Sequence, residues 1–269
     1  ERTPIRADLI ARLPKLKMLT LNGPYPHVDL DACTARGVVL CAGKPRPSSA
    51  TAELTWGLII CAMRQIPQQM ASLKRGQWQT ALGRGLRGRT LGVWGYGRIG
   101  QQVAAFGRAF GMKVLIWSRE TGLASARADG YAAAPSKQAL FEEADVLSLH
   151  VRLNAETRGM VTAEDLARMK PTALIANTSR AELIEPGALV AALKAGRPGM
   201  AAIDVFEKEP VTDLQQPLLN MNNVVCTPHL GYVERDQLER YYNDQFNRVL
   251  AFEKGAPVDV ANPQALAAR

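Results

Sequence analysis

The sequence lacks the patterns that mark several large classes of protein. No apolar run approaches the ~20 residues that a membrane-spanning helix needs, and no secretory signal is present. There are only four cysteines, and their positions show no metal-binding or redox spacing: Cys33, Cys41, Cys61 and Cys226. We therefore expect reduced, mostly buried thiols in a cytoplasmic protein without a membrane partner.

Clusters of metal ligands and of basic residues are absent as well. The three histidines, the cysteines and the carboxylates have no metal-ligand spacing, so we expect no metal. The formal net charge is +8, but the lysines and arginines are scattered along the chain. We interpret this charge as a solvated basic surface that steers small anions, and we expect no nucleic-acid partner.

The length and composition suit one large domain or two modest ones. The chain has 269 residues, of which 47% are hydrophobic, so it can bury a sizeable core. It starts at Glu1 rather than at Met, and we expect further residues to precede it in the natural protein. Internal repeats and low-complexity segments are absent.

The stretch 90–119 predicts a strand, a glycine turn, a helix and a second strand. The turn reads Gly95-Tyr96-Gly97-Arg98-Ile99-Gly100. Gly95 allows a tight turn, Gly97 lets a pyrophosphate approach the backbone, and Gly100 lets the helix pack close to the strand. The N–H groups and the dipole at the start of the helix then favour phosphate, and Arg98 and Ile99 are expected cofactor contacts. Because both strands and the helix are present, the motif predicts dinucleotide binding.

Apolar runs alternate with helical patterns along the rest of the chain. Strands are predicted at Leu16–Leu21, Val38–Cys41, Leu91–Trp94, Val114–Trp117, Val146–Leu149, Ala173–Ala176, Ala201–Val205 and Val224–Cys226. Further helices are predicted at Leu30–Arg36, Thr51–Leu73, Ser136–Glu143, Thr162–Arg168, Glu185–Ala195 and Val233–Lys254. This alternation implies a parallel sheet covered by helices.

One predicted helix, Thr51–Leu73, is apolar on nearly every side, which indicates burial on most sides. Thr51 is a suitable N-cap for it. The preceding stretch, Gly43–Ser49, is rich in Pro, Gly and Ser and is typical of a linker.

Four motifs together resemble the D-isomer-specific 2-hydroxyacid dehydrogenase family. They are Leu86–Gly92 with the glycine turn, Asn177-Thr178-Ser179-Arg180, Asp204–Pro210, and Thr227-Pro228-His229-Leu230-Gly231. The resemblance covers nearly the whole chain. It implies a Rossmann-type doubly wound parallel sheet, at 49–232, inserted in a smaller discontinuous flavodoxin-like α/β substrate domain made of 1–48 and 233–269. The start of that smaller domain is largely absent from this sequence.

The resemblance also implies a catalytic trio. Arg180 follows a predicted strand, and its planar guanidinium can grip carboxylate and carbonyl oxygens. His229 corresponds to the family's catalytic acid, since an imidazole gives and takes a proton near neutrality. Glu209 corresponds to the carboxylate that orients this ring and stabilises the imidazolium. Glu207, two residues away, is expected to be a solvated surface residue.

The expected contacts to the cofactor combine the glycine turn with the ends of later strands. Asp204 resembles the family's Asp that faces the nicotinamide carboxamide, His150 is expected to line the cofactor groove, and Thr178 to use its backbone. The full set is Gly95, Gly97, Arg98, Ile99, Gly100, Ser118, Arg119, His150, Thr178, Asp204 and Gly231.

The end of the second strand of the glycine unit bears on cofactor choice. NAD-selective folds place an acidic residue there to bind the ribose hydroxyls. This sequence has Ser118 and Arg119, which can hold a 2′-phosphate, although Glu120 is close by. The sequence therefore predicts NAD(P) binding with NADP favoured over NAD.

The resemblance implies an oxidoreductase that interconverts a small anionic 2-keto acid and a D-2-hydroxy acid, such as hydroxypyruvate, glyoxylate or a phosphoglycerate-like substrate. The family's loop with a G-x-D-like pattern is replaced here by Gly23-Pro24-Tyr25-Pro26-His27, which leaves the substrate open. Two alternatives are an NAD(H)-sensing co-repressor-like binding protein and a dehydrogenase of formate or phosphite on the same scaffold. The family also pairs through the Thr51–Leu73 region, which predicts a homodimer.

Overall fold

A computed structural model describes residues 3–43 and 49–267. The chain divides into two compact units, one of Glu1–Ser48 with Glu234–Arg269 and the other of Ser49–Val233. Most of the predicted linker, residues 44–48, lies outside the described residues. Within the described ranges, no helix is both long enough and apolar enough to span a membrane.

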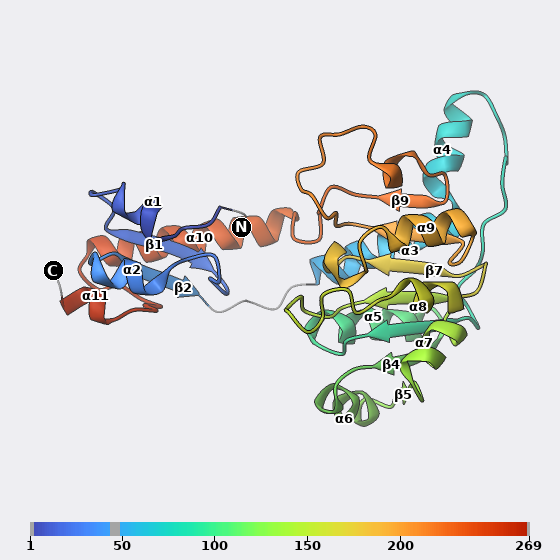
Figure 1. The fold of residues 1–269 in the computed structure, drawn as a ribbon, viewed down its shortest axis with the longest axis horizontal. Helices are drawn as coiled ribbons and strands as arrows, with labels where there is room; N and C mark the ends of the chain where they lie inside the picture. The colour runs from blue at the N-terminus through green and yellow to red at the C-terminus, as the bar shows by residue number, and fades with distance from the viewer. Residues whose placement is uncertain (1–2, 44–48, 268–269) are drawn as a thin grey trace. The chain divides into compact units, whose positions relative to one another are not determined.

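The elements follow the alternating order that the apolar runs predict (Figure 1). The strands are β1 (Met18–Asn22), β2 (Val39–Gly43), β3 (Thr90–Trp94), β4 (Lys113–Trp117), β5 (Ala132–Ala133), β6 (Val146–Leu149), β7 (Leu174–Asn177), β8 (Met200–Ile203) and β9 (Val224–Cys226). The α-helices are α1 (Ala7–Ala11), α2 (Leu30–Ala35), α3 (Ala50–Arg64), α4 (Ile66–Lys74), α5 (Arg98–Ala109), α6 (Glu120–Ala128), α7 (Lys137–Glu143), α8 (Ala163–Arg168), α9 (Ala188–Ala195), α10 (Arg235–Glu253) and α11 (Gln264–Ala267). Two short 3₁₀ helices are η1 (Ala181–Leu183) and η2 (Pro217–Asn220).

The larger unit contains a seven-stranded parallel sheet with the order β5-β4-β3-β6-β7-β8-β9. Strand β3 comes first along the chain in this sheet, β4 and β5 are added on one side of it, and β6 is added on the other side of β3. The strand order reverses between β3 and β6, where ligands bind in open α/β sheets. This doubly wound sheet confirms the predicted Rossmann-type α/β class.

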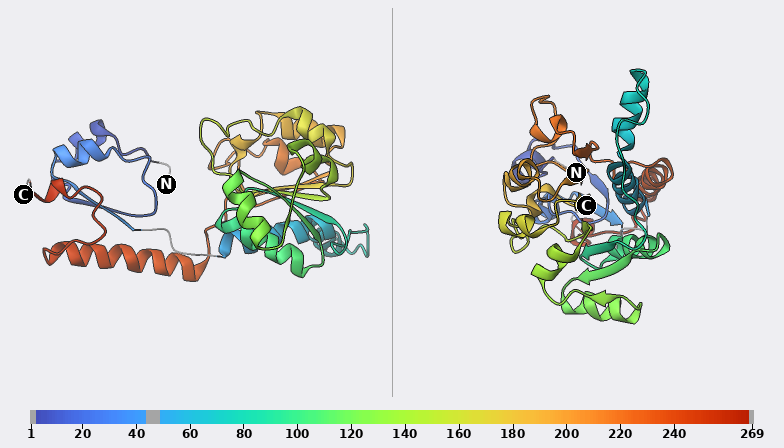
Figure 2. Two further views of the ribbon diagram at one scale, coloured as in Figure 1. Left: turned by 90° about the horizontal axis from the view of Figure 1, so that it is seen from below. Right: turned by 90° about the vertical axis from the view of Figure 1, so that its right-hand side faces the viewer.

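Helices cover both faces of this sheet (Figure 2). One apolar cluster joins α3, α5 and α6 to the sheet, and the other joins α7, α8 and α9 to its opposite face. Successive strand residues alternate between the clusters, as Leu174 and Ile175 do in β7. The central strands are therefore buried on both faces, which explains why they are mostly apolar.

The smaller unit has a two-stranded parallel sheet in which Met18 pairs with Val39 and Asn22 with Gly43. Helix α10 packs against β1, and its buried Arg248 binds Asp259 and Asn22 at 2.9 and 2.8 Å. Two described strands do not distinguish a flavodoxin-like arrangement from others, so that part of the fold stays a prediction.

The predicted single helix at Thr51–Leu73 is wrong, because the structure has two helices, α3 and α4, there. Gln65 breaks the path with a left-handed φ of 54°. Pro67 follows in the first turn of α4, where its missing N–H and its ring prevent a continuous helix. The N-cap of α3 is Ser49 rather than Thr51, whose hydroxyl binds Gly231 instead.

Two other helix boundaries differ from the prediction, and the elements α1, α6, β5 and α11 were not predicted. The helix expected at Glu185–Ala195 begins only at Ala188, because Gly187 adopts a left-handed φ of 75° just before it. The helix expected from Val233 begins at Arg235, where the Glu234 carboxylate caps the first turn. Helix α6 was not predicted, although Leu123 and Ala126 form a buried face at helical spacing.

Candidate functional site

The three glycines of the turn after β3 meet different surroundings. Gly95 has a φ of +98°, and a Cβ there would lie 2.5 Å from the backbone oxygen of His150. A Cβ on Gly100 would lie 2.0 Å from the oxygen of Gly95, so the helix packs directly on the turn. A Cβ on Gly97 would meet nothing within 4 Å. The protein itself therefore leaves open the space at Gly97, at the N-cap of α5, where a pyrophosphate would approach.

His150 follows β6, the strand beside β3, and its backbone N–H binds the oxygen of Trp94 at 2.7 Å. Its Nε2 lies 2.8 Å from the hydroxyl of Ser148. Burial lowers the pKa of His150 to about 4, so the ring is neutral near neutral pH. The ring can line a binding groove there, and it is not suited to proton transfer at that pH.

The end of β4 carries Ser118 and Arg119. The hydroxyl of Ser118 accepts a hydrogen bond from the N–H of Tyr96 at 3.4 Å, which leaves its own hydrogen available to a ligand. Arg119 is exposed and precedes α6. Glu120, the nearby carboxylate, pairs with Arg127 at 2.8 Å along the outer surface of that helix. The carboxylate closest in sequence to Ser118 and Arg119 is thus paired with Arg127.

Arg180 follows β7 in a turn that side chains hold in place. Asn177 accepts a bond from the N–H of Ser179 at 3.1 Å and donates to the oxygen of Arg180 at 2.8 Å. The hydroxyl of Ser179 donates to Val151 at 2.7 Å. The guanidinium of Arg180 is exposed, so the turn is fixed while the charged group remains accessible.

Asp204, at the end of β8, is fully buried and organises the next loop. Its carboxylate accepts bonds from the hydroxyl of Thr227 at 2.6 Å and from the N–H groups of Leu230 and Gly231 at 2.7 and 2.8 Å. The predicted contact of Asp204 with a nicotinamide stays a prediction. What the structure adds is that Asp204 and Gly231 hold the segment that contains His229.

His229 and Glu209 form a direct pair. The Nδ1 of His229 lies 2.7 Å from Oε2 of Glu209, and both side chains are mostly buried. The other oxygen, Oε1, accepts from the N–H of Phe206 at 3.0 Å, which fixes the carboxylate. With Nδ1 facing the carboxylate, Nε2 lies on the side of the ring away from Glu209 and can exchange a proton with a ligand. Glu207, in contrast, is exposed.

The topology gathers these residues at one edge of the sheet. Strands β7, β8 and β9 are parallel neighbours, and Arg180, Glu209 and His229 follow their carboxyl ends in that order. The glycine turn and His150 follow β3 and β6 at the same edge. Among the described residues, no group of His, Cys, Asp or Glu has the geometry of a metal site. The end of β9 also carries Cys226, whose pKa burial raises to about 11, so it stays a neutral thiol.

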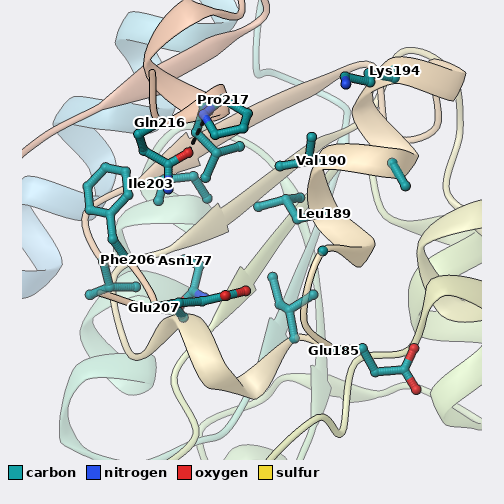
Figure 3. A pocket seen from close by; sticks show the side chains of 16 residues that line it. Asn177, Glu185, Leu189, Val190, Lys194, Ile203, Phe206, Glu207, Gln216 and Pro217 are labelled. Carbon is teal, nitrogen blue, oxygen red and sulfur yellow. Dashed lines mark hydrogen bonds between the residues drawn. The ribbon is translucent and has the colours of Figure 1, made fainter. Parts of the chain in front are cut away.

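A separate pocket of about 460 Å³ lies over the α9 face of the sheet (Figure 3). Its wall includes Leu189, Val190, Phe206, Glu207 and Gln216, while the proposed catalytic residues and the glycine turn do not line it.

The sequence analysis missed two kinds of contact around the trio. The ring of Tyr232 packs edge-on against His229 with centroids 5.8 Å apart. The hydroxyl of Thr51 binds the loop that contains His229, and the hydroxyl of Thr55 binds the loop that contains Arg180. Two threonines four residues apart in an otherwise apolar helix are the signal that could have indicated the second contact.

Comparison with known proteins agrees with this geometry. Residues 56–231 match the family described as D-isomer specific 2-hydroxyacid dehydrogenase, NAD binding domain. A D-3-phosphoglycerate dehydrogenase of Methanocaldococcus jannaschii is 40% identical over 232 residues, which are 85% of this chain and 44% of that protein. A glyoxylate reductase of Thermococcus litoralis is 34% identical over 96% of this chain and 81% of its own length.

The solved structures agree as well. A phosphoglycerate oxidoreductase from Vibrio cholerae superposes with a TM-score of 0.88 at 47% identity, over 95% of this chain and 82% of the other. The chain thus spans less than half of one curated relative and most of the others compared. The chain belongs to the D-isomer-specific 2-hydroxyacid dehydrogenases, oxidoreductases with a Rossmann-type nicotinamide-binding domain.

Proposed function

We propose that this protein reduces a small 2-keto acid to the D-2-hydroxy acid and catalyses the reverse oxidation. The observation that carries the proposal is the 2.7 Å pair of Glu209 and His229, one strand away from the turn of Arg180. A proton donor and a cation that grips a carboxylate thus share the sheet edge with the glycine turn. These are the groups that reduction of a keto acid requires of a protein.

Each residue has a distinct role in this proposal. Arg180 binds the carboxylate of the substrate and polarises the carbonyl that is reduced. His229 donates a proton from Nε2 to the developing alkoxide and takes it back in the oxidation. Glu209 holds the ring through Nδ1 and stabilises the imidazolium.

The residues of the glycine turn fit a nicotinamide dinucleotide, because the open side of Gly97 leaves room that a Cβ would fill. Such a cofactor, when bound, supplies the hydride. We favour NADP over NAD, since Arg119 is exposed next to Ser118 and Glu120 is paired with Arg127. His150, Thr178 and Asp204 remain proposed contacts.

The substrate itself stays open beyond a small anionic 2-keto acid. Substrate carboxylates in this family are expected to meet backbone N–H groups of the loop after β1. Here the N–H of Gly23 binds Gly43 at 2.9 Å, and Pro24 and Pro26 have none. A cytoplasmic location, inferred from the reduced cysteines, also stays a proposal.

The replacement Arg180→Ala tests the assignment of the site. Loss of a bidentate charged contact should raise the KM for the keto acid and lower kcat, together reducing kcat/KM by about 10²- to 10³-fold. The dissociation constant of the dinucleotide, measured by fluorescence, should stay near that of the wild type. Wild-type values of both kinetic constants would show that Arg180 has no such role.

A further inference from the structure

Two hydroxyls on α3 reach the loops that contain His229 and Arg180. Thr51 Oγ1 donates to the backbone oxygen of Gly231 at 2.7 Å. Thr55 Oγ1 lies 2.7 Å from the backbone oxygen of Thr51 and 2.7 Å from Oγ1 of Thr178. Thr55 is completely buried, and Thr178 is 6% exposed. One turn of a helix therefore binds both loops through hydroxyl groups.

The hydrogen atoms of these hydroxyls can be assigned. The carbonyl oxygen of Thr51 can only accept, so the hydrogen of Thr55 points to it. Thr178 must then donate its own hydrogen to Thr55 Oγ1. This order runs from Thr178 to Thr55 to the backbone oxygen of Thr51, and it gives the buried hydroxyls of Thr178 and Thr55 a partner each.

Both anchor points lie two residues from a proposed catalytic group. Thr178 precedes Arg180 by two residues, and Gly231 follows His229 by two. The backbone of Gly231 is held on both sides, since its N–H binds Asp204 at 2.8 Å and its oxygen binds Thr51. A shift of either anchor would be transmitted to its neighbouring catalytic side chain over a very short stretch of backbone.

We propose that Thr51 and Thr55 are positioning residues. Their hydrogen bonds from α3 hold His229 and Arg180 in their places relative to each other. The inference rests on the proposed function. It assigns the two threonines different effects. Loss of the Thr51 hydroxyl releases the His229 loop and lowers kcat, whereas loss of the Thr55 hydroxyl releases the Arg180 loop and raises the KM for the keto acid. Misplacement of a catalytic group by about 1 Å can cost up to 10²-fold in rate.

The test compares Thr51→Val, Thr55→Val and Thr55→Ser with the wild type in steady-state kinetics with NADPH and a 2-keto acid. Thr162→Ala is the stability control, because it removes the N-cap of α8 and none of the hydrogen bonds that Thr51 and Thr55 make. We expect about a tenfold loss of kcat in Thr51→Val and about a tenfold rise of KM in Thr55→Val, near the middle of the range for such misplacements. Thr55→Ser keeps the hydroxyl and should restore the KM.

The outcomes separate the inference from the proposed function. If the two valine variants lose thermal stability like Thr162→Ala but keep wild-type kcat and KM, the threonines are structural only and the inference is wrong. The same holds if Thr55→Ser behaves like Thr55→Val. A wild-type protein that binds NADPH but reduces no keto acid would overturn the proposed function, and the inference with it.

Discussion

At the scale of single residues, His229 combines strain with tight support. Its φ of +57° lies in the left-handed region, which costs a non-glycine residue about 1–3 kcal/mol. Bonds from Glu209 to the ring, and from Asp204 to the N–H groups of Leu230 and Gly231, hold this conformation. The sequence motif could predict that His229 matters, but not the backbone conformation, because residues far along the chain impose it.

The Glu209–His229 pair predicts a loss of rate when the carboxylate is removed. Oε2 of Glu209 lies 2.7 Å from Nδ1 of His229 and orients the ring for proton transfer. Glu209→Gln should therefore lower kcat for the keto acid by about tenfold or more, because the ring is no longer held by a charged partner. The matched control is Glu207→Gln, which removes an exposed carboxylate two residues away and should leave kcat unchanged. A wild-type kcat in Glu209→Gln would exclude the role.

The choice of cofactor depends on Arg119. If its guanidinium binds the 2′-phosphate, Arg119→Ala should lower kcat/KM for NADPH by about tenfold or more and leave that for NADH nearly unchanged. Both constants are measured with the same keto acid. Arg235→Ala serves as the control, since Arg235 is an exposed arginine on α10 that pairs with Glu239 at 3.8 Å. A wild-type preference for NADH that survives Arg119→Ala would contradict the assignment.

At the scale of elements, local sequence predicted strands better than helix ends. The strands of the sheet centre are buried on both faces, and their unbroken apolar runs made them easy to recognise. Helix ends depend on single residues, and Pro67 and Gly187 moved two of them. Helix α6 was not predicted because its buried face is narrow, with Leu123 and Ala126 as its buried residues.

The glycine turn gives a prediction about the β3–α5 element. Gly97→Ala should leave the free energy of unfolding near the wild-type value, because its Cβ meets nothing within 4 Å. The same change should weaken dinucleotide binding by about tenfold or more, which corresponds to at least about 1.4 kcal/mol. Gly100→Ala should instead destabilise the fold by about 1–3 kcal/mol, since its Cβ would lie 2.0 Å from the oxygen of Gly95. Denaturant unfolding and fluorescence titration measure the two effects. Gly97→Ala that binds NADPH like the wild type would show that no pyrophosphate approaches there.

At the scale of the whole molecule, the site residues could be predicted from the sequence, but their proximity in space could not. Arg180, Glu209 and His229 are spread over about fifty residues, and only the order β7-β8-β9 shows that their loops are neighbours. Their roles were predicted from resemblance to a family, while the supporting hydroxyls of Thr51 and Thr55 match no motif. Contacts of that kind depend on how distant segments pack, which one sequence does not reveal.

The exposed apolar surface around α4 supports the proposal of a homodimer. Met70 and Leu73 are 55% and 57% exposed, whereas α3 is largely buried within its own unit. Patches of this kind on a folded protein mark interaction sites, and a twofold dimer is the commonest solution. We expect a dimer in sedimentation at micromolar concentration and a monomer for Leu73→Glu. The control Leu214→Glu changes a leucine elsewhere that is even more exposed, at 79%, and should stay dimeric. A monomeric wild type would contradict the proposal.

The most direct test of the central claim is the absorbance of the reduced nicotinamide when the protein is mixed with NADPH and a panel of small 2-keto acids, including glyoxylate and hydroxypyruvate. We predict a loss of absorbance that depends on one or more of these acids. We also predict that His229→Ala slows this loss by about 10²- to 10⁴-fold while the protein still binds NADPH. Unchanged absorbance with every keto acid and both reduced cofactors, or a rate unaffected by His229→Ala, would contradict the claim.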